Sequence, residues 1–488
     1  MKRWLLLGSL VLATAMPLLR GAVYQATGIK IGEVTADSAI VWTRLTSVKE
    51  PHRDGLKFVE MKRREAEARE PSAQMPAGAT LAEMERAVPG ARGALRVVWT
   101  PAGGKDSQAT PWTDVNPAAD FTTQFKLSGL QAGTTYQLRV ESRDATGEAG
   151  EVLEGGFRTP PAEDQASGVR FIITTCHDDW RRDDREDGFK MYRAAAKWAP
   201  EFFVHTGDFV YLDKPMPFAL TPEFARFKWN RTSAWPSVRE FYRNTSAYFI
   251  KDDHDISHND SAPGDQFGAL SFQKGVDIVD EQLPIPDAPS YRSVRWGQHL
   301  EVWLLESREY RNARKREAVS ERTLLGEEQK KWLFESLKKS TATFRLVISG
   351  TPIVGPNVDY KGGDSGDSLA DEVFHSEGEE VRRVLASLPN TFVVAGDRHW
   401  QYHSVDPKTG LNEFACGPAC FGMAQEFVDK VKRSAMHRFL RIDGGFFSGE
   451  IARASDGAMR LVVRHHDVNG SIVYEHAFDA ALARASAR

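Results

Sequence analysis

Residues that can bind metal ions and anions follow five short apolar runs that lie between residues 169 and 395. The runs end in the blocks Thr-Thr-Cys176-His177-Asp178-Asp179, Gly207-Asp208-Phe-Val-Tyr211, Asp252-Asp253-His254-Asp255, Glu306-Ser-Arg308-Glu-Tyr-Arg311 and Gly396-Asp397-Arg398-His399. One block alone is weak evidence, because a Gly-Asp pair after a strand is usually a turn and an acidic run is usually a solvated loop. Five such blocks are hard to explain in this way, so we interpret them as parts of one site.

The chemistry of that site follows from the residue types. Carboxylates that are brought together repel one another unless cations lie between them. Carboxylate oxygens suit a hard multivalent cation, imidazole accommodates iron or zinc, and the Cys176 thiolate adds a softer ligand. Arginines beside such ions favour a phosphate or carboxylate substrate, because the guanidinium fork matches these anions. The sequence therefore predicts a polynuclear metal site that is suited to hydrolysis by a metal-bound hydroxide.

The elements that must position these blocks alternate between strands and helices. Apolar runs at 169–173, 202–204, 246–250, 300–305, 344–348 and 392–395 predict strands, and 188–198, 223–230, 327–339 and 378–388 predict helices. This alternation is typical of an α/β domain with a buried sheet. Ligands bind beyond the carboxyl ends of strands in such sheets, so we expect the five blocks to converge on one edge. Later strands, with a hairpin turn at 468–471, complete the domain.

The first part of the chain has a different pattern, of short alternating strands. Residues 38–44 alternate polar and apolar side chains, and Tyr136 heads a strand in the manner of the tyrosine corner of fibronectin-type sandwiches. Charged, Ala- and Pro-rich sequence at 48–93 interrupts this pattern, and we interpret it as a partly helical surface insertion without chemistry. The predicted domains are a small all-β sandwich at 23–160, a linker at 161–168 and an α/β catalytic domain at 169–488.

The N-terminus has the pattern of an export signal. Lys2 and Arg3 precede an apolar stretch at 4–19, which is shorter than the roughly 20 residues that a membrane span needs. A buried N-terminal helix is the alternative interpretation. We predict a signal peptide at 1–22, a periplasmic, extracellular or cell-surface location, and no stable membrane span after the signal is removed.

Composition limits the classes of partner. The formal net charge is −4, so no global basic field would attract nucleic acid, and we do not predict nucleic acid as a specific partner. The chain has three cysteines, and an odd number in an exported protein leaves at least one thiol for another task. Cys416 and Cys420 could pair or stay free, which leaves Cys176 as the odd one. The sequence does not predict an oligomeric state.

The blocks resemble the signature sequences of a known family. Gly207-Asp208-x-x-Tyr211, Asp252-Asp253-His254-Asp255 and Gly396-Asp397-Arg398-His399 look like those of the alkaline phosphatase D (PhoD-like phosphatase) family, within the calcineurin-like and purple acid phosphatase group. The likeness includes Cys176, the block at 306–311, Ser349-Gly-Thr-Pro-Ile353 and the β-sandwich ahead of the catalytic domain. It implies a four-layer αββα metallophosphoesterase fold that is preceded by a fibronectin- or immunoglobulin-like sandwich.

The resemblance also implies a centre that contains Fe³⁺ and Ca²⁺, with Zn²⁺ or Mn²⁺ as alternatives at the second position. The implied iron ligands are Cys176, Asp208, Tyr211 and His399. Asp208 would bridge to the second metal, which Asp253 and Asp397 would also bind.

Residues that contact the substrate are implied as well. His254 stands where the wider group places its general acid, and Arg308 and Arg311 would hold the phosphoryl oxygens. Asn259 is an accessory ligand or a phosphate contact. With His254, Arg308 and Asp208 as catalytic residues, the implied activity is an exported metal-dependent phosphomonoesterase or phosphodiesterase. A metal-bound hydroxide would attack phosphorus in line.

Two regions depart from the pattern of near relatives. Asp367-Ser-Leu369-Ala-Asp371 lacks a histidine that they carry, and Gly417-Pro-Ala-Cys420-Phe-Gly-Met423 lacks their Asp and His. These departures leave two alternatives, which are a non-catalytic or altered-specificity cell-surface binding protein on the same scaffold, and hydrolysis of another ester. The retained metal-binding residues favour the phosphoesterase, because a scaffold kept for binding alone has no physical need for clustered carboxylates.

Overall fold

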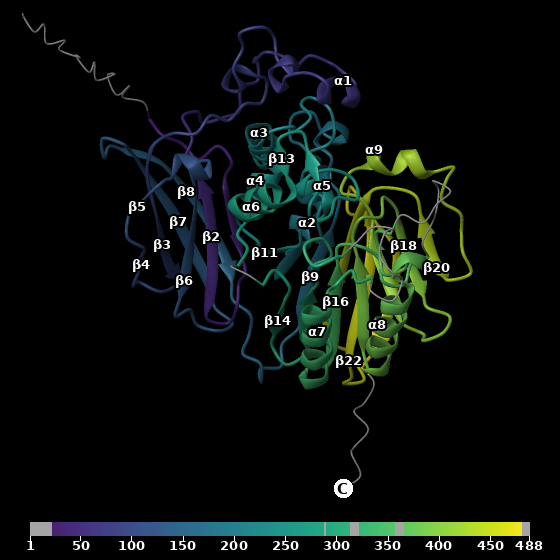
Figure 1. Cartoon of the computed structure of the whole chain (residues 1–488). Coiled ribbons are helices and arrows are strands. Elements are labelled where there is room, and N and C mark those ends of the chain that lie inside the picture. Colours follow the sequence, from purple (N-terminus) through teal and green to yellow (C-terminus); the bar gives the residue numbers. More distant parts are fainter. Residues whose placement is uncertain (1–21, 287–288, 313–321, 357–365, 481–488) are drawn as a thin grey trace, which may run out of the picture.

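The computed structural model describes residues 22–286, 289–312, 322–356 and 366–480, so the predicted signal peptide lies almost wholly outside the described residues. Two β-sheets face each other, and helices cover their outer faces (Figure 1). This arrangement confirms the predicted αββα architecture with an all-β region ahead of it. Among the described residues, no helix has the length and apolar character that a bilayer crossing requires.

The first sheet has nine strands and carries most of the candidate site. Its spatial order is β23 (Ile472–Asp479), β22 (Met459–Asp467), β21 (Gly445–Arg453), β9 (Val169–Thr174), β10 (Phe202–His205), β11 (Ser246–Phe249), β1 (Ile29–Gly32), β2 (Ser38–Arg44) and β6 (Thr122–Ser128). Strands β9, β10, β11 and β1 run parallel, so their carboxyl ends lie at one edge. The strands predicted from the runs at 169–173, 202–204 and 246–250 and the hairpin turn between β22 and β23 are confirmed.

The second sheet has seven strands. Its spatial order is β14 (Arg292–Trp296), β15 (Leu300–Leu304), β16 (Phe344–Ser349), β17 (Thr391–Ala395), β19 (Asn412–Cys416), β18 (Gln401–Val405) and β20 (His437–Arg441). Strands β15, β16, β17 and β19 run parallel. Their residues are mostly buried, as expected of parallel strands that are covered on both faces.

The helices form the two outer layers. Those on the nine-stranded sheet are α2 (Lys190–Lys197), α3 (Pro222–Ser233), α4 (Pro236–Tyr242) and α6 (Phe272–Gln282), and those on the seven-stranded sheet are α7 (Glu327–Lys339) and α8 (His375–Ser387). Between the sheets, Phe171 and Tyr248 of the first pack in one core with Val302, Ile348 and Val394 of the second.

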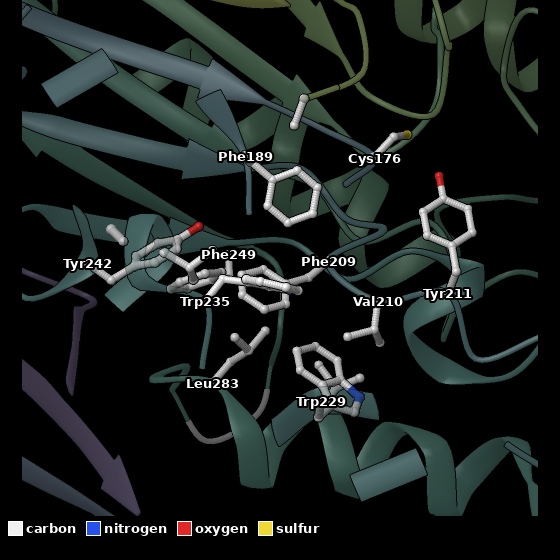
Figure 2. Packing of buried hydrophobic residues seen from close by; sticks show 14 of the residues in the cluster. Cys176, Phe189, Phe209, Val210, Tyr211, Trp229, Trp235, Tyr242, Phe249 and Leu283 are labelled. Atoms are coloured by element: carbon white, nitrogen blue, oxygen red, sulfur yellow. The ribbon is translucent and has the colours of Figure 1, made fainter. Parts of the chain in front are cut away.

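Aromatic side chains of α3 and α4 form much of the core under the first sheet. Trp229 and Tyr242 are fully buried, and Phe209 stacks on Trp229 with ring centroids 5.4 Å apart. Helix α3 begins at Pro222, and the Thr221 side chain caps it by accepting the N–H of Phe224. These aromatic residues therefore serve the packing of the core (Figure 2).

Shorter elements connect these layers. They are α1 (Arg63–Glu67), α5 (Asp253–Ile256), α9 (Phe421–Ala424), β12 (Gln266–Phe267), β13 (Leu270–Ser271), and the 3₁₀ turns η1 (Pro71–Gln74), η2 (Leu81–Glu83), η3 (Pro117–Ala119), η4 (Asp179–Arg181), η6 (Glu372–Phe374) and η7 (Gln425–Phe427).

The first part of the chain forms a β-sandwich that shares one of its sheets with the catalytic part. Its other sheet contains β3 (Gly93–Pro101), β4 (Gln108–Ala109), β5 (Thr113–Asp114), β7 (Thr135–Asp144) and β8 (Ala149–Arg158). This sheet packs on β1, β2 and β6 around a core that includes Ile31, Val41 and Val140. Strand β1 pairs with β11, Ile31 opposite Ser246. The division into folding units at 161–168 stays a prediction.

The predicted tyrosine corner is present in this sandwich. The Tyr136 hydroxyl accepts the backbone N–H of Gln131 at 2.8 Å, and the ring is 3% exposed. The phenol therefore ties the turn before β7 to the strand, as it does in fibronectin-type domains.

The insertion at 48–93 leaves the sandwich between β2 and β3 and lies over the catalytic part (Figure 1). It contains α1, η1 and η2, so its partly helical character is confirmed. Gln74 is 2% exposed and exchanges two hydrogen bonds with the Phe218 backbone, at 2.8 and 3.0 Å. The Phe58 ring packs edge-on against Phe227 of α3, with ring centroids 5.2 Å apart. The insertion is thus fixed to the catalytic part by buried contacts.

Buried histidines predict a loss of stability in acid. Burial lowers the pKa of His465 to about 3, and its Nε2 donates to Ala415 O at 2.9 Å. An unfolded histidine titrates near about 6.5, so between these pH values the unfolded state binds a proton that the folded state does not. The free energy of unfolding therefore falls as the pH is lowered through this window.

We expect wild type to lose about 1–2 kcal/mol more than His465→Gln between pH 7 and pH 5, in urea unfolding measured at both values. The other buried histidines contribute equally to both proteins and cancel in this comparison. Equal losses in the two proteins would contradict the assignment.

Candidate metal centre

The five polar blocks meet at the carboxyl edge of the parallel strands. Cys176 follows β9, Asp208 follows β10, Asp253 begins α5 after β11, and Asp397 and Arg308 follow β17 and β15 of the facing sheet. Loops from both sheets therefore supply the site, which is the usual place for a ligand in such a fold.

Three of these residues have left-handed backbone conformations. The φ angles of Cys176, Asp208 and Asp397 are 52°, 58° and 59°. Non-glycine residues adopt this region rarely, at a cost of roughly 1–3 kcal/mol each. Each of the three turns the chain sharply just beyond a strand end, so the surrounding packing must hold these turns in place.

Two glycines allow the loops to pack edge to edge. Gly207 has φ 105°, and a Cβ there would lie 2.4 Å from Asp252 Cβ. A Cβ on Gly396 would lie 2.4 Å from Thr206 Oγ1. The glycine before each of Asp208 and Asp397 is therefore required by space at that position.

Four side chains converge to form a first cluster. Asp208 Oδ2 accepts the Tyr211 hydroxyl at 2.8 Å and lies 3.3 Å from Cys176 Sγ, and the Tyr211 hydroxyl lies 3.2 Å from His399 Nε2. Ligand atoms of Cys176, Asp208 and His399 all lie within 4.8 Å of one another. In Figure 2, Cys176 and Tyr211 stand at one margin of the aromatic core.

A second group of carboxylates shares Asp208 with this cluster. Asp208, Asp253 and His254 have ligand atoms within 4.8 Å of one another, and so have Asp253, Asp260 and Asp367. Asp397 lies beside them, where its amide N–H donates to Thr175 Oγ1 at 3.2 Å and its carboxylate pairs with Arg398 Nη1 at 2.5 Å. Asp208 therefore stands between two sets of oxygen, nitrogen and sulfur ligands, as a bridging ligand would.

Asp255 holds the loop that carries these ligands. Its carboxylate accepts the backbone N–H groups of Asp208 (2.8 Å), Val210 (3.0 Å) and Asp252 (2.9 Å). Burial raises its pKa to about 7, against the lowering effect of these hydrogen bonds. Asp255 thus ties the β10 loop to the start of α5 and does not face the ligand cluster.

Arg308 is buried among the carboxylates. The guanidinium is fully buried, with ion pairs to Asp252 and, at 2.6 Å, to Asp367, and it lies 3.8 Å from Asp253. Arg311 lies 3.5 Å from Asp367. These two arginines neutralise the side of the site that lies away from Cys176.

Several buried polar atoms lack a hydrogen-bond partner among the described residues. On the acidic side they are Asp208 Oδ1, Asp252 Oδ2 and His399 Nδ1, and on the basic side they are Arg308 Nη2, Arg311 Nε and Nη1, and Arg398 Nε and Nη2. An unpaired buried polar group costs about 1–3 kcal/mol. Acceptors and donors left open at one site fit a group of cations with an anion beside them, so the residues fit the implied metal centre.

The electrostatics also favour bound cations. Burial, with the charges of Asp208 and Asp397, raises the pKa of the Cys176 thiol well above its usual range. Burial raises the pKa of Asp397 to about 7, although Arg398 opposes the shift. Such acids are hard to ionise without added positive charge, and bound metal ions are what would hold them as anions.

His254 is oriented by a carboxylate. Its Nδ1 lies 2.7 Å from Asp213 Oδ1, and Asp213 Oδ2 accepts the N–H of Asn259 at 3.2 Å. Burial opposes charge on His254, but Asp213, Asp253 and Asp208 raise its pKa well above the usual range. The ring packs on Tyr211 with centroids 4.4 Å apart, so His254 borders the first cluster.

The other predicted residues take different places. Asn259 is exposed at the rim, where its backbone contacts Asp213. All three cysteines are free and buried, so Cys416 and Cys420 do not pair. Leu369, in one departing region, packs in the core under the second sheet.

No individual role is predicted from the sequence for Asp213, Asp252, Asp255, Asp367 and Arg398, although Asp252, Asp255 and Arg398 lie in the predicted blocks. The N-cap at Asp252 with Asp255 three residues later is a readable helix-start signal, and it anticipates their backbone contacts. Asp213 and Asp367 carry no such signal, because their partners His254 and Arg308 are distant in sequence.

Comparison with known families gives two matches. The model of the PhoD-like phosphatase family matches residues 171–443, and that of the PhoD-like phosphatase N-terminal domain matches residues 19–161. The chain is similar to alkaline phosphatase D of Bacillus subtilis (strain 168), with 21% identity over an alignment of 333 residues that covers 59% of this chain and 55% of that protein. The match thus spans about half the length of that relative.

Solved structures share the fold. The structure of PhoD aligns over 95% of this chain and 92% of its own, with a TM-score of 0.68 and 16% identity. Purple acid phosphatase PPD1 from yellow lupin (Lupinus luteus) seeds aligns over 92% and 74%, with a TM-score of 0.61 and 11% identity. Both confirm the predicted fold class.

The close approach at Gly207 gives a test of this geometry. Gly207→Ala would force a Cβ into Asp252 at a left-handed position, so we expect a loss of about 3 kcal/mol or more in stability, and at least tenfold weaker metal binding. The matched control is Gly103→Ala, where φ is 79° but no atom lies within 4 Å, and about 1 kcal/mol is expected. Equal effects of the two changes, by thermal unfolding and metal analysis, would show that the Asp252 contact is unimportant.

Proposed function

The chain belongs to the PhoD-like phosphatase family, and on that premise we propose that it is an exported, metal-dependent phosphoesterase acting on phosphomonoesters or phosphodiesters. One observation carries the proposal. Buried acidic ligands that repel one another lie close to buried guanidinium groups. Both sets include polar atoms that have no hydrogen-bond partner among the described residues. Such a site suits a substrate that is itself an anion beside cations.

The metal ligands of the proposal are those of the two clusters. Cys176, Asp208, Tyr211 and His399 would hold Fe³⁺, and Asp208, Asp253 and Asp397 would hold Ca²⁺, with Zn²⁺ or Mn²⁺ as alternatives. When bound, the metal ions would supply positive charge to the phosphoryl oxygens and lower the pKa of water. Thiolate, phenolate and imidazole suit the first ion, and the carboxylates suit a harder second ion.

The substrate's phosphoryl group would meet the open donors of the arginines. Arg308 Nη2 and Arg311 Nε and Nη1 have no hydrogen-bond partner among the described residues, although Arg311 Nη1 lies 3.5 Å from Asp367. Ion pairs with Asp252 and Asp367 fix the two side chains. Arg398 adds Nε and Nη2 from the opposite loop. Donors that are held before the substrate arrives cost no reorganisation when charge develops on the equatorial oxygens. Asn259 is a further contact from the rim.

His254 would move a proton to the leaving group. Its Nδ1 proton is held by Asp213, which fixes the ring and leaves Nε2 for the leaving oxygen. The arrangement makes the contribution of His254 largest for leaving groups that need protonation.

Export stays part of the proposal and rests on Lys2, Arg3 and the apolar stretch at 4–19, which lie outside the described residues.

The activity is tested with para-nitrophenyl phosphate and its bis-ester, hydrolysed by purified protein loaded with iron and calcium. We expect turnover that falls at least about 1,000-fold in Asp208→Asn, because Asp208 joins both clusters. No turnover of either ester by folded protein that holds metal would favour the binding scaffold or another ester. The bis-ester rate relative to the monoester rate gives the substrate class.

The proton-transfer role predicts a dependence on the leaving group. In Asp213→Asn we expect kcat to fall about 10- to 100-fold for phenyl phosphate and much less for para-nitrophenyl phosphate, whose leaving group needs little protonation. Asp277→Asn, on the exposed side of α6, serves as the control. A loss of the same size for both esters would show that Asp213 acts only on the structure.

A further inference from the structure

The segment after Tyr211 is held rigidly beside the candidate site. The Lys214 carbonyl accepts Lys228 Nζ at 2.7 Å, and the Met216 carbonyl accepts Arg231 Nη1 at 2.7 Å. Two residues further on, the Phe218 backbone exchanges two hydrogen bonds with the Gln74 side chain of the insertion. The backbone that carries Lys214 is therefore fixed from three directions.

Lys214 presents an unpaired charge at the mouth of the site. Its Nζ lies 5.9 Å from the centroid of the Tyr211 ring, and no carboxylate of the described residues lies within 4.0 Å of it. The side chain is partly exposed, so its ammonium group is open to solvent.

The insertion adds a second cation on the same side. Arg63 of α1 has its guanidinium 4.7 Å from the Phe267 ring, and its Nη1 lies 4.0 Å from Asp213 Oδ2. Asp213 is already engaged by His254 and by the Asn259 N–H, and 42% of the Arg63 side chain is exposed. Arg63 also donates to Glu67 at 2.8 Å, which sets its orientation on the helix.

The surroundings of His399 differ. There Arg181 is paired with Glu426, and Phe427 packs on His399 with ring centroids 5.1 Å apart. Arg181 is closely ion-paired there, whereas Lys214 has no carboxylate of the described residues within 4.0 Å, and Phe427 adds an apolar surface. The two flanks of the site therefore offer different chemistry to a substrate.

We propose that Lys214 and Arg63 form an anion-binding subsite that selects phosphate esters whose leaving group carries a second negative charge, a carboxylate or a further phosphate. The proposal rests on the proposed function, because His254 marks the leaving-group side and both cations flank its partner Asp213. Arg63 reaches the site only through the insertion at 48–93, to which sequence reasoning assigned no chemistry. The insertion is thus a specificity element contributed by the sandwich part of the chain.

The test compares two substrates that differ in one charge, 4-carboxyphenyl phosphate and its methyl ester, with full-length metal-loaded protein. The measured quantity is the ratio of their kcat/KM values. Comparing this ratio between wild type and variant cancels the difference in intrinsic reactivity of the two leaving groups. We expect this ratio to fall about three- to fivefold in Lys214→Ala and in Arg63→Gln, and about tenfold in the double variant, mainly through KM.

The matched control is Arg64→Gln, which removes the same charge from the neighbouring exposed position of α1 and should keep the ratio within about twofold of wild type. Raising the ionic strength from about 0.02 M to about 0.5 M should shrink the wild-type preference.

A ratio unchanged in the double variant, or lowered equally by Arg64→Gln, would overturn the subsite. In the first case the cations do not contact the leaving group, and in the second only the general field of α1 acts. Hydrolysis of neither ester by wild type would instead remove the proposed function, and the subsite with it. A 4-phosphonooxyphenyl phosphate substrate distinguishes a carboxylate preference from a preference for a second phosphate.

Discussion

Repulsion among buried acids is the constraint on which the rest of this structure depends. Cys176, Asp208 and Asp253 are brought together at buried strand ends where water screens them poorly, and the partly buried Asp397 lies beside them. The fully buried Arg308 pairs with Asp252 and Asp367 and lies 3.8 Å from Asp253, so it offsets only part of the acidic charge at the site. Cys176 and Asp397 have raised pKa values, and Asp208 Oδ1 has no hydrogen-bond partner among the described residues, so the fold is left with a deficit of positive charge that metal ions match. A buried cluster of this kind has no purpose in packing, because apolar residues of the same volume would cost less.

Holding such a cluster requires a backbone that would otherwise be avoided. Left-handed turns at Cys176, Asp208 and Asp397 aim the side chains inward, and Gly207 and Gly396 let the loops touch. Asp255 connects two of these loops by accepting three backbone N–H groups, so a carboxylate that faces away from the cluster stabilises its geometry. The aromatic core around Trp229 packs against the same loops. Strain at the ligands is thus compensated by hydrogen bonds and packing nearby.

Much of the fold and of the ligand cluster could be predicted from the sequence, whereas contacts between distant loops could not. Strands β9, β10 and β11 are apolar runs that end in polar blocks, so the edge where Asp208 lies follows from the rule for parallel sheets. The family resemblance and the αββα fold are confirmed by the family and structure matches. The partnership of His254 with Asp213, or of Arg308 with Asp367, depends on loops that meet only in the folded chain. The pairing of β1 with β11 was missed for the same reason, because a strand's sequence shows its buried faces and not its neighbours.

That pairing changes how the first part of the chain should be understood. A sandwich joined by a linker would be free to move relative to the catalytic part, but here one of its sheets continues the catalytic sheet. The Gln74–Phe218 hydrogen bonds and the packing of Phe58 then fix the insertion over α3. Because the insertion is held in this way, α1 keeps a constant position beside Asp213. A charged side chain needs such a fixed position to discriminate between substrates. The same rigidity means that changes in the insertion alter the mouth of the site while the ligand clusters, which lie on the catalytic strands, stay as they are. Specificity and metal binding can therefore vary independently in this architecture.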